Sequence, residues 1–153
     1  MTAGPSTEPY PLARFVTAQE GVFDRALDEL AKGRKHGHWM GFVFPQLRGL
    51  GQSDLSWVYG LTSLAEARAY LAHPLLGARL RQAVLAATRA PAGSVTQLFG
   101  SPDHLKFRSC LTLFDRAAVA EDLVFVRAMD RWRLEPDPLT LKRLGSKTEP
   151  RPR

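Results

Sequence analysis

Residues 63–89 read SLAEARAYLAHPLLGARLRQAVLAATR, and this stretch decides the fold class. It begins with the capping-box pattern of Ser63 and Glu66, a hydroxyl at the helix start followed three residues later by a carboxylate. Pro74 then stands where a second helix begins, a position at which its missing N–H is harmless. Apolar residues recur from there to Arg89 at three- and four-residue steps, the spacing of one helix face. The stretch predicts two consecutive helices.

The same two signals, a capping residue and an apolar stripe, recur along the rest of the chain. For residues 121–133 a strand is the alternative, because the segment is rich in β-branched residues. Residues 39–44 form either one helical turn or a short strand before Pro45 breaks them. Further helices are expected over residues 18–32 (capped by Thr17 and stopped by Gly33), 94–99, 102–118, 121–133 and 137–144.

These elements form one domain. No repeat of fixed period and no linker long enough to separate two domains is visible. We therefore predict an all-α, compact single domain of six to seven short-to-medium helices over residues 12–145. The proline-containing residues 1–11 form a mobile lead-in, and residues 146–153 form a basic tail.

Composition narrows the class of protein. The 153 residues are 44% apolar and 24% charged, which is ordinary for a globular domain. No apolar stretch approaches the ~20 residues that a membrane span needs. The N-terminal residues have no signal-peptide pattern, and Cys110 has no second cysteine to pair with. We expect a cytoplasmic protein with no membrane segment, and the oligomeric state stays open.

The net charge of +6 invites a nucleic-acid interpretation. Residues 142–153 carry five basic residues and one acidic residue, so most of the excess lies at the C-terminal end. A basic tail attracts any polyanion, and no recognition motif for nucleic acid accompanies it. Nucleic acid is thus a partner with weak support.

Residues 35–53 are the part of the chain that folding explains least. Groups able to bind anions or transfer protons are mixed there with aromatic residues. The glycines permit an anion nest of backbone N–H groups, and Ser53 could cap a following helix. The alternatives are a tight turn packed on aromatic rings and, for His38, a hydrogen-bonded structural role. The candidate ligand-binding residues are Lys35, Trp39, Gln46, Gly49, Gly51 and Ser53, with His38 as a candidate catalytic residue.

A second polar cluster lies in the predicted helix 102–118. Asp103, Lys106 and Ser109 step by three along it, beside an apolar side made of Leu105, Phe107, Leu111, Leu113 and Phe114. Lys106 and Ser109 are further candidate ligand-binding residues, and Asp103 is a second candidate catalytic residue. The alternative is an ordinary solvated face on which Lys106 pairs with Asp103. The hydroxyl of Ser109 lies between apolar neighbours and needs a partner, which residues 35–53 could supply. No histidine or cysteine spacing suits a metal, and we expect neither metal nor cofactor.

At these clusters the sequence resembles a known family, the bacterial domain of unknown function 1810, sometimes mislabelled calpastatin. Gly41 departs from the pattern, since similar sequences have tryptophan there; if that ring lines a pocket, the pocket here is wider or less aromatic. The resemblance implies a compact, mainly helical domain and no established activity. It covers residues 12–135 and rests on Arg14-Phe15, Ala18-Gln19, Lys35, His38-Trp39-Met40, Phe44-Pro45-Gln46, Gly49-Leu50-Gly51, Ser53, Tyr70-Leu71, His73-Pro74, Gly77, Asp103, Lys106, Ser109 and Thr112-Leu113-Phe114.

Two functional hypotheses follow. In the first, a pocket between residues 35–53 and helix 102–118 takes an anionic, nucleotide-like ligand, which Lys35 and Lys106 hold. The ring of Trp39 stacks on it, and His38 or Asp103 acts as general acid or base, so that a glycosidic bond of a nucleotide or ADP-ribose-type conjugate could be hydrolysed. In the second, the protein is a non-catalytic module that binds nucleic acid or protein through its arginines and basic tail. A purely structural hydrogen-bond network is the remaining alternative.

Overall fold

The computed structural model describes residues 10–50 and 54–145, except for the side chains of residues 54–56. It is 62% helical, which confirms the predicted all-α class. Within the described residues, no helix is long and apolar enough to cross a membrane. Six of the ten helices in the described part have seven residues or more. They are α1 (Ala13–Gln19), α2 (Phe23–Ala31), α3 (Met40–Val43), α4 (Asp54–Tyr59), α5 (Leu64–Ala72), α6 (Leu76–Thr88), α7 (Val95–Phe99), α8 (Asp103–Ala117), α9 (Val124–Trp132) and α10 (Pro138–Arg143).

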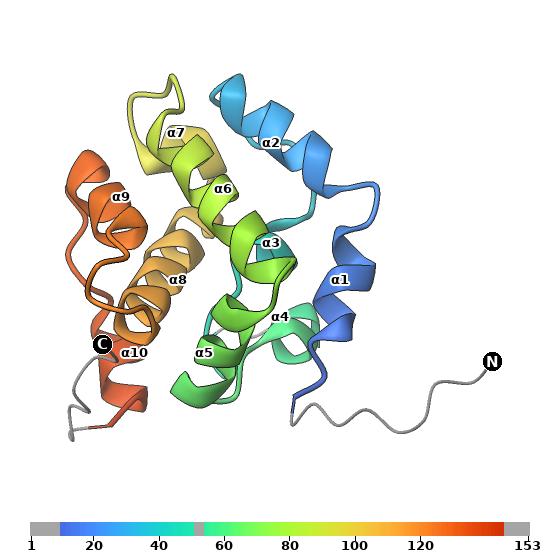
Figure 1. Cartoon of the computed structure of the whole chain (residues 1–153). Helices are drawn as coiled ribbons and strands as arrows, with labels where there is room; N and C mark the ends of the chain where they lie inside the picture. Colours follow the sequence, from blue (N-terminus) through green and yellow to red (C-terminus); the bar gives the residue numbers. More distant parts are fainter. Residues whose placement is uncertain (1–9, 51–53, 146–153) are drawn as a thin grey trace.

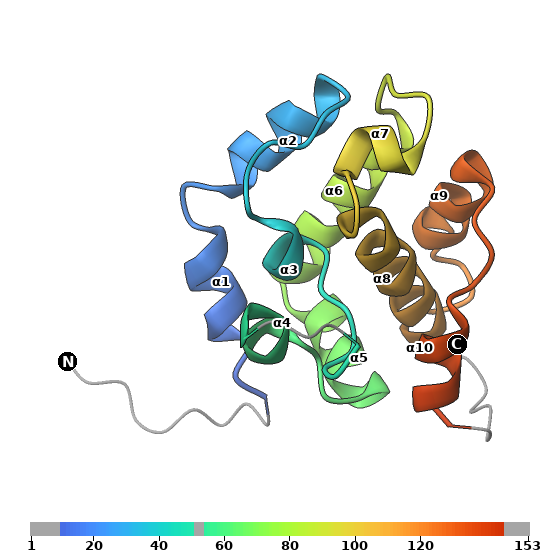
Figure 2. The same ribbon diagram turned by 180° about the vertical axis from the view of Figure 1, so that it is seen from behind.

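The longest helix, α8, lies in the middle of the molecule. It packs against α3, α5, α7, α9 and α10. On the other side, α6 crosses the molecule and packs against α2, α5 and α9 (Figure 1). From behind, α3 and α7 are seen against α8, with α4 and α5 below (Figure 2). Segments distant in sequence are therefore brought together on α8.

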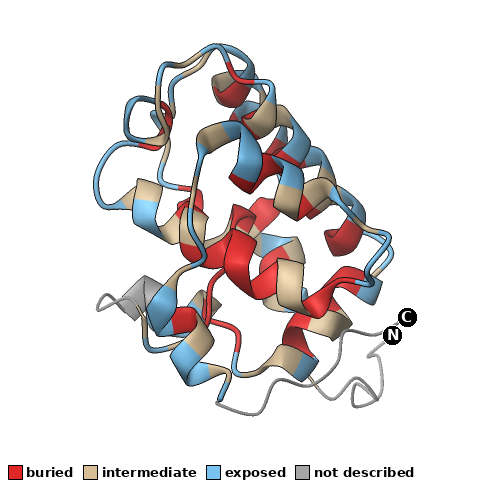
Figure 3. Ribbon diagram, turned by 90° about the vertical axis from the view of Figure 1, so that its left-hand side faces the viewer, coloured by how far each residue is buried: buried red, intermediate tan, exposed pale blue. Residues whose placement is uncertain are grey.

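Aromatic rings fill the space around α8. Phe107 packs edge-on against Phe44 at 5.1 Å and lies 4.5 Å from Phe99 between ring centroids. Further along the helix, Phe114 lies 5.4 Å from Tyr70. All of these rings are buried, and Figure 3 shows that the buried residues line the inner helix faces. Edge-to-face and tilted pairs at such distances stabilise a core beyond the area that they bury.

Several of the predicted helix starts are confirmed. The Ser63 hydroxyl accepts from Glu66 N at the start of α5, and the Ser94 hydroxyl accepts from Gln97 N at the start of α7. Asp137 caps α10 in the same way. Residues 39–44 contain the helical turn α3, and the segment with the strand alternative is the helix α9.

Two predictions about helices are wrong. The helix expected over residues 18–32 exists only as α2 and the last two residues of α1, because Glu20 has an extended ψ of 127° and Gly21 adopts a φ of +68° that no helix continues through. Thr17 therefore lies inside α1 and caps nothing. Leu105, expected on the buried side of α8, is 52% exposed.

Gly33 ends α2 as predicted, and it also lets two segments approach closely. Its φ is +82°, and a Cβ at this position would lie 2.6 Å from the carbonyl oxygen of Pro91. Gly21 has a similar φ of +68°, but a Cβ there would meet no atom within 4 Å. Comparing substitutions at the two glycines therefore distinguishes the cost of backbone strain from the cost of steric overlap.

We predict that Gly33→Ala lowers the free energy of unfolding more than Gly21→Ala does. The left-handed conformation costs about 1–2 kcal/mol with a Cβ at either position. Only at Gly33 does the overlap with Pro91 add about 1–3 kcal/mol. Urea denaturation of both variants measures the difference; equal losses would contradict the close approach.

Candidate functional site

The two polar clusters singled out in the sequence meet in the structure. The ammonium nitrogen of Lys35 lies 2.8 Å from Asp103 Oδ2, and that of Lys106 lies 3.7 Å from Asp103 Oδ1. The Lys35 side chain is only 8% exposed and the Asp103 side chain 21%. Two ammonium groups therefore share one carboxylate in a partly buried place, and the three groups together carry a net charge of +1.

A small cavity lies beside Lys106. Its volume is about 10 Å³, room for a single water molecule at most. A Cβ on Gly41 would meet no atom within 4 Å, so this glycine leaves space rather than making a close contact. This cavity lies within the region where the sequence placed the ligand pocket, and by itself it is too small for a nucleotide. Its lining residues are Gly41, Phe44, Gln46, Tyr59, Gly60 and Lys106.

Trp39 belongs to the core. The side chain is 1% exposed, its ring lies 6.0 Å from that of Phe44, and the ammonium group of Lys35 lies 5.3 Å from the ring centroid. The ring is therefore not available to stack on a ligand, which corrects the role expected for it. Instead it supports Lys35 through a cation–π contact.

Glu29, which the sequence analysis missed, holds the segment after α2 in place. One carboxylate oxygen accepts hydrogen bonds from the backbone N–H groups of His36 and Gly37 at 2.6 and 2.9 Å. It also accepts from Trp39 Nε1 at 2.9 Å. Burial alone would raise the pKa of Glu29, but these hydrogen bonds outweigh it and lower the pKa below its ordinary value. No sequence spacing links a helix carboxylate to a following loop, so this residue carried no local signal.

A larger cleft lies next to this segment, between the end of α2, the α6–α7 connection and α7. These three segments lie at the upper edge of Figures 1 and 2. Its volume is about 590 Å³, within the range of small-molecule sites. Its two charged lining residues, Arg34 and Lys35, are both cationic. The residues that line the cleft are Gly33, Arg34, Lys35, Pro91, Ala92, Gly93, Thr96, Gln97, Phe99 and Gly100.

Hydrogen bonds fix the walls of the cleft. Lys35 N donates to Leu98 O at 2.7 Å, which ties the segment after α2 to α7. On the opposite wall, Gly93 N donates to Gln97 Oε1 at 2.8 Å. The cleft is therefore largely formed before any ligand arrives. Arg34 is exposed and was not among the candidates from the sequence, because a lone arginine after a helix has no distinguishing pattern.

The other candidate residues are spread over the molecule. His38 is exposed on the segment between α2 and α3. Gly49 has a φ of +93°, as a nest requires, but its carbonyl oxygen accepts from Arg143 Nη2 at 3.2 Å, so it lies against α10. Gly51 and Ser53 lie outside the described residues.

Ser109 finds a different partner from the expected one. Its hydroxyl lies 3.1 Å from Leu105 O and 3.2 Å from Asp137 Oδ2 and shares its one proton between these two acceptors, neither of which belongs to residues 35–53. The neighbouring Thr112 hydroxyl accepts from Asp137 N at 2.9 Å. These hydroxyls therefore dock α10 onto α8, and the expectation that the 35–53 segment satisfies them is wrong.

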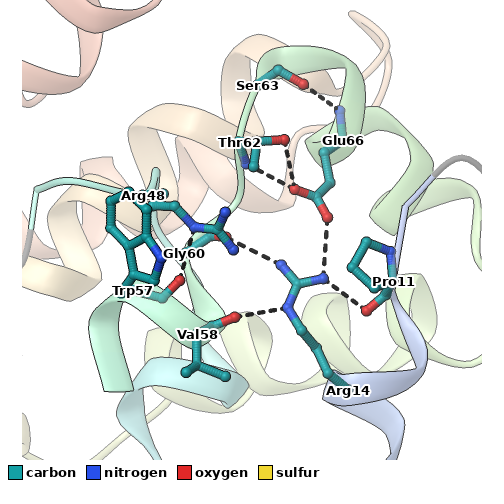
Figure 4. A network of polar contacts seen from close by, with 9 residues as sticks. All are labelled: Pro11, Arg14, Arg48, Trp57, Val58, Gly60, Thr62, Ser63 and Glu66. Atoms are coloured by element: carbon teal, nitrogen blue, oxygen red, sulfur yellow. Dashed lines mark hydrogen bonds and ion pairs between the residues drawn. The ribbon is translucent and has the colours of Figure 1, made fainter. Parts of the chain in front are cut away.

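A further polar network surrounds Arg14, a residue of the family resemblance (Figure 4). Its guanidinium group donates to Val58 O, to Gly60 O and to the buried Glu66 carboxylate. The same carboxylate accepts from Thr62 N at 2.8 Å. The hydrogen bonds of this network join α1, α4 and α5, so its role is to hold the fold together.

We predict that Glu29→Gln makes the protein less stable at neutral pH and flattens its acid dependence. The pKa of Glu29 is lower in the folded protein than in the unfolded chain, so the ionised carboxylate stabilises the fold above the ordinary glutamate pKa. This contribution is lost as the pH falls through the folded-state pKa. The neutral amide accepts more weakly than the carboxylate. Urea denaturation at pH 7 and at pH 3 measures this.

The matched control for this prediction is Glu20→Gln, which changes an exposed glutamate at the end of α1. This variant should follow the wild-type pH dependence. Glu29→Gln and Glu20→Gln curves that coincide at both pH values would contradict the structural role of Glu29.

Comparison with known proteins places the chain in a family. No match is found among curated proteins. The chain is similar to the crystal structure of the conserved hypothetical protein Rv1873 from Mycobacterium tuberculosis, with 45% identity and a TM-score of 0.86 over 90% of this chain and 98% of that one. The family model described as "Protein of unknown function (DUF1810)" matches residues 9–144. This confirms the resemblance drawn from the sequence: the chain belongs to the DUF1810 family.

Proposed function

We propose that this protein binds a small anionic, nucleotide-like ligand in the cleft between Gly33–Lys35, Pro91–Gly93 and α7. The observation that carries the proposal is the charge of the lining: the two charged residues of this 590 Å³ cleft are both cationic. Ligand sites of this size use a few placed polar groups to fix orientation. Here Arg34 and Lys35 supply them on one wall.

The cationic wall is built to stay in place. Lys35 is fixed by Asp103, by the ring of Trp39 beneath it and by its backbone bond to Leu98. Because Lys35 and Lys106 both pair with Asp103, the three side chains together keep a net positive charge. An anion that approaches the cleft therefore meets cations that are already in position. This improves affinity, because less side-chain entropy is lost on binding.

The remaining lining residues favour a ligand with hydroxyl and amide groups. Arg34 is exposed and can grip a phosphate or carboxylate through two parallel hydrogen bonds. Thr96 and Gln97 are exposed on the facing wall, and the NH2 end of Gln97 is not used in its bond to Gly93. A phosphate at Arg34 and a sugar or base at α7 would fit this arrangement.

The proposal extends to chemistry at the edge of the cleft. Hydrolysis of a glycosidic bond would need one group to take a proton from water and another to protonate the leaving group. Asp103, which is ion-paired with Lys35 of the cleft wall, is the proposed base, and the exposed His38, three residues after Lys35 in the chain, is the proposed acid. Water would then add to the anomeric carbon as the bond to the base or conjugate breaks.

The cytoplasm is the compartment that we propose. Cys110 is fully buried, and burial raises the pKa of its thiol well above the ordinary value. The thiol therefore stays protonated in the core. With a single cysteine, the chain cannot form an internal disulfide, the bond that an oxidising compartment would favour.

We predict that Arg34→Ala weakens binding of nucleotides or ADP-ribose at least about tenfold, because a charge-assisted contact worth about 1.5–3 kcal/mol is lost. Titration calorimetry and the rise of the melting temperature with ligand concentration measure this. The matched control is Lys32→Ala, which removes a cation close to the cleft whose side chain is 73% exposed and bound to Asp28. Equal affinities in the wild type and Arg34→Ala would refute binding in this cleft.

For the chemical part, Asp103→Asn and His38→Ala should each lower kcat by about 10²–10⁴-fold. His38→Ala should leave ligand affinity within a factor of two, because the proposed contacts to the anion come from Arg34 and Lys35. Release of free base or sugar from nucleotide and ADP-ribose conjugates is the readout. If the wild-type protein binds these compounds but releases no product, the proposed hydrolysis is refuted and only the binding function stands.

A further inference from the structure

A second feature suited to binding lies away from the cleft, where Arg48 stacks on the ring of Trp57. Trp57 is 62% exposed, the most exposed of the large apolar side chains in the described part of the chain. The guanidinium carbon of Arg48 lies 4.9 Å from its ring centroid, and Arg48 Nε donates to Trp57 O at 2.8 Å (Figure 4). Both side chains are therefore held in a defined arrangement at the surface.

Packing does not explain this exposed indole. Trp132 shows what a structural tryptophan looks like here: Arg131 also stacks on its ring, at 3.9 Å, but its indole N–H donates to Ala87 O and its side chain is partly buried. Trp57 instead leaves most of its ring in water, so the fold does not gain the free energy that burial of this apolar ring would give. An ordered, exposed aromatic ring of this kind indicates a contact surface.

Further cations among the described side chains lie close to Arg48. The carbonyl oxygen of Gly49, next to Arg48 in the chain, accepts from Arg143 Nη2 at 3.2 Å, which brings the end of α10 close to the backbone beside Arg48. Lys142 is exposed beside Arg143. The nearby Glu66 offers no counter-charge at the surface, since it is 1% exposed and bonded to Arg14. In sequence, Lys147, Arg151 and Arg153 follow shortly after.

We propose that the Arg48–Trp57 surface, formed by Arg48, Trp57, Lys142 and Arg143, binds single-stranded nucleic acid. An unpaired base stacks on the exposed face of the indole, and the cations hold the phosphates on either side. Ordered aromatic rings beside cations are the usual means of binding single strands without sequence preference. A paired base offers no free face to the ring, so the surface selects single strands over duplex. This site is independent of the ligand cleft.

The test uses the full chain and a fluorescently labelled oligothymidylate of about twelve nucleotides, with anisotropy recorded over a series of salt concentrations. Trp57→Ala should weaken binding at least about fivefold, because stacking is lost, and should leave the salt dependence unchanged. Arg143→Ala should lower the slope of log affinity against log salt by about 0.7, the effect of one phosphate contact. Trp57→Phe, which keeps a ring, should restore most of the affinity.

The matched control is Arg131→Ala, which removes an arginine stacked on a tryptophan at a different place, on α9. It should bind like the wild type, and so should Arg34→Ala of the cleft, so failure here is distinguishable from failure of the proposed function. Melting temperatures of all variants verify the fold. Unchanged affinity in Trp57→Ala would overturn the proposal. Binding of anionic vesicles or acidic peptides that needs Trp57, without binding of the oligothymidylate, would overturn it too.

Discussion

The ion pair between Lys35 and Asp103 joins two parts of the chain that lie far apart in sequence, and the functional geometry depends on it. Lys35 belongs to the segment after α2, and Asp103 opens α8, the helix around which the core is built. With Lys35 only 8% exposed, loss of its partner would leave a nearly buried charge unpaired, which is strongly unfavourable. The pair therefore fixes the position of the segment, and with it one wall of the cleft.

Other polar networks do the same for other elements. Glu29 holds the segment between α2 and α3, Arg14 joins α1 to α4 and α5, and Asp137 docks α10 on α8. In each, one charged side chain satisfies several donors or acceptors that would otherwise be left without partners inside the protein. These short helices have little apolar surface of their own, so such bonds contribute to their placement as well as the core does.

This distribution of roles separates the functional candidates from the structural ones. Trp39 and Ser109 have complete structural roles, and their side chains are buried. Arg34 and Trp57 are exposed, and they belong to different segments: Arg34 follows α2 and Trp57 lies in α4. The cleft offers a preorganised set of cations for a small anion, whereas the Arg48–Trp57 surface offers a ring and charges for a longer polyanion. The two proposals therefore rest on different residues and different physics.

The helices themselves were determined by local sequence. The caps at Ser63, Ser94 and Asp137 and the stop at Gly33 act within three or four residues, so they are visible in the sequence and present in the structure. The break at Gly21 was missed because the apolar stripe continues across it, and a stripe does not reveal the sign of φ.

The composition of the site was decided by the tertiary structure. From the sequence, Lys35, Asp103 and Lys106 could be placed in one site, and the structure brings them together. The sequence could not show that Trp39 is buried, nor that Asp137 is the partner of Ser109. Nor did it indicate that the larger cleft lies against α7. Helix periodicity determines which side chains share a face, but which faces meet depends on how all the helices pack at once, and that information is spread over the whole chain.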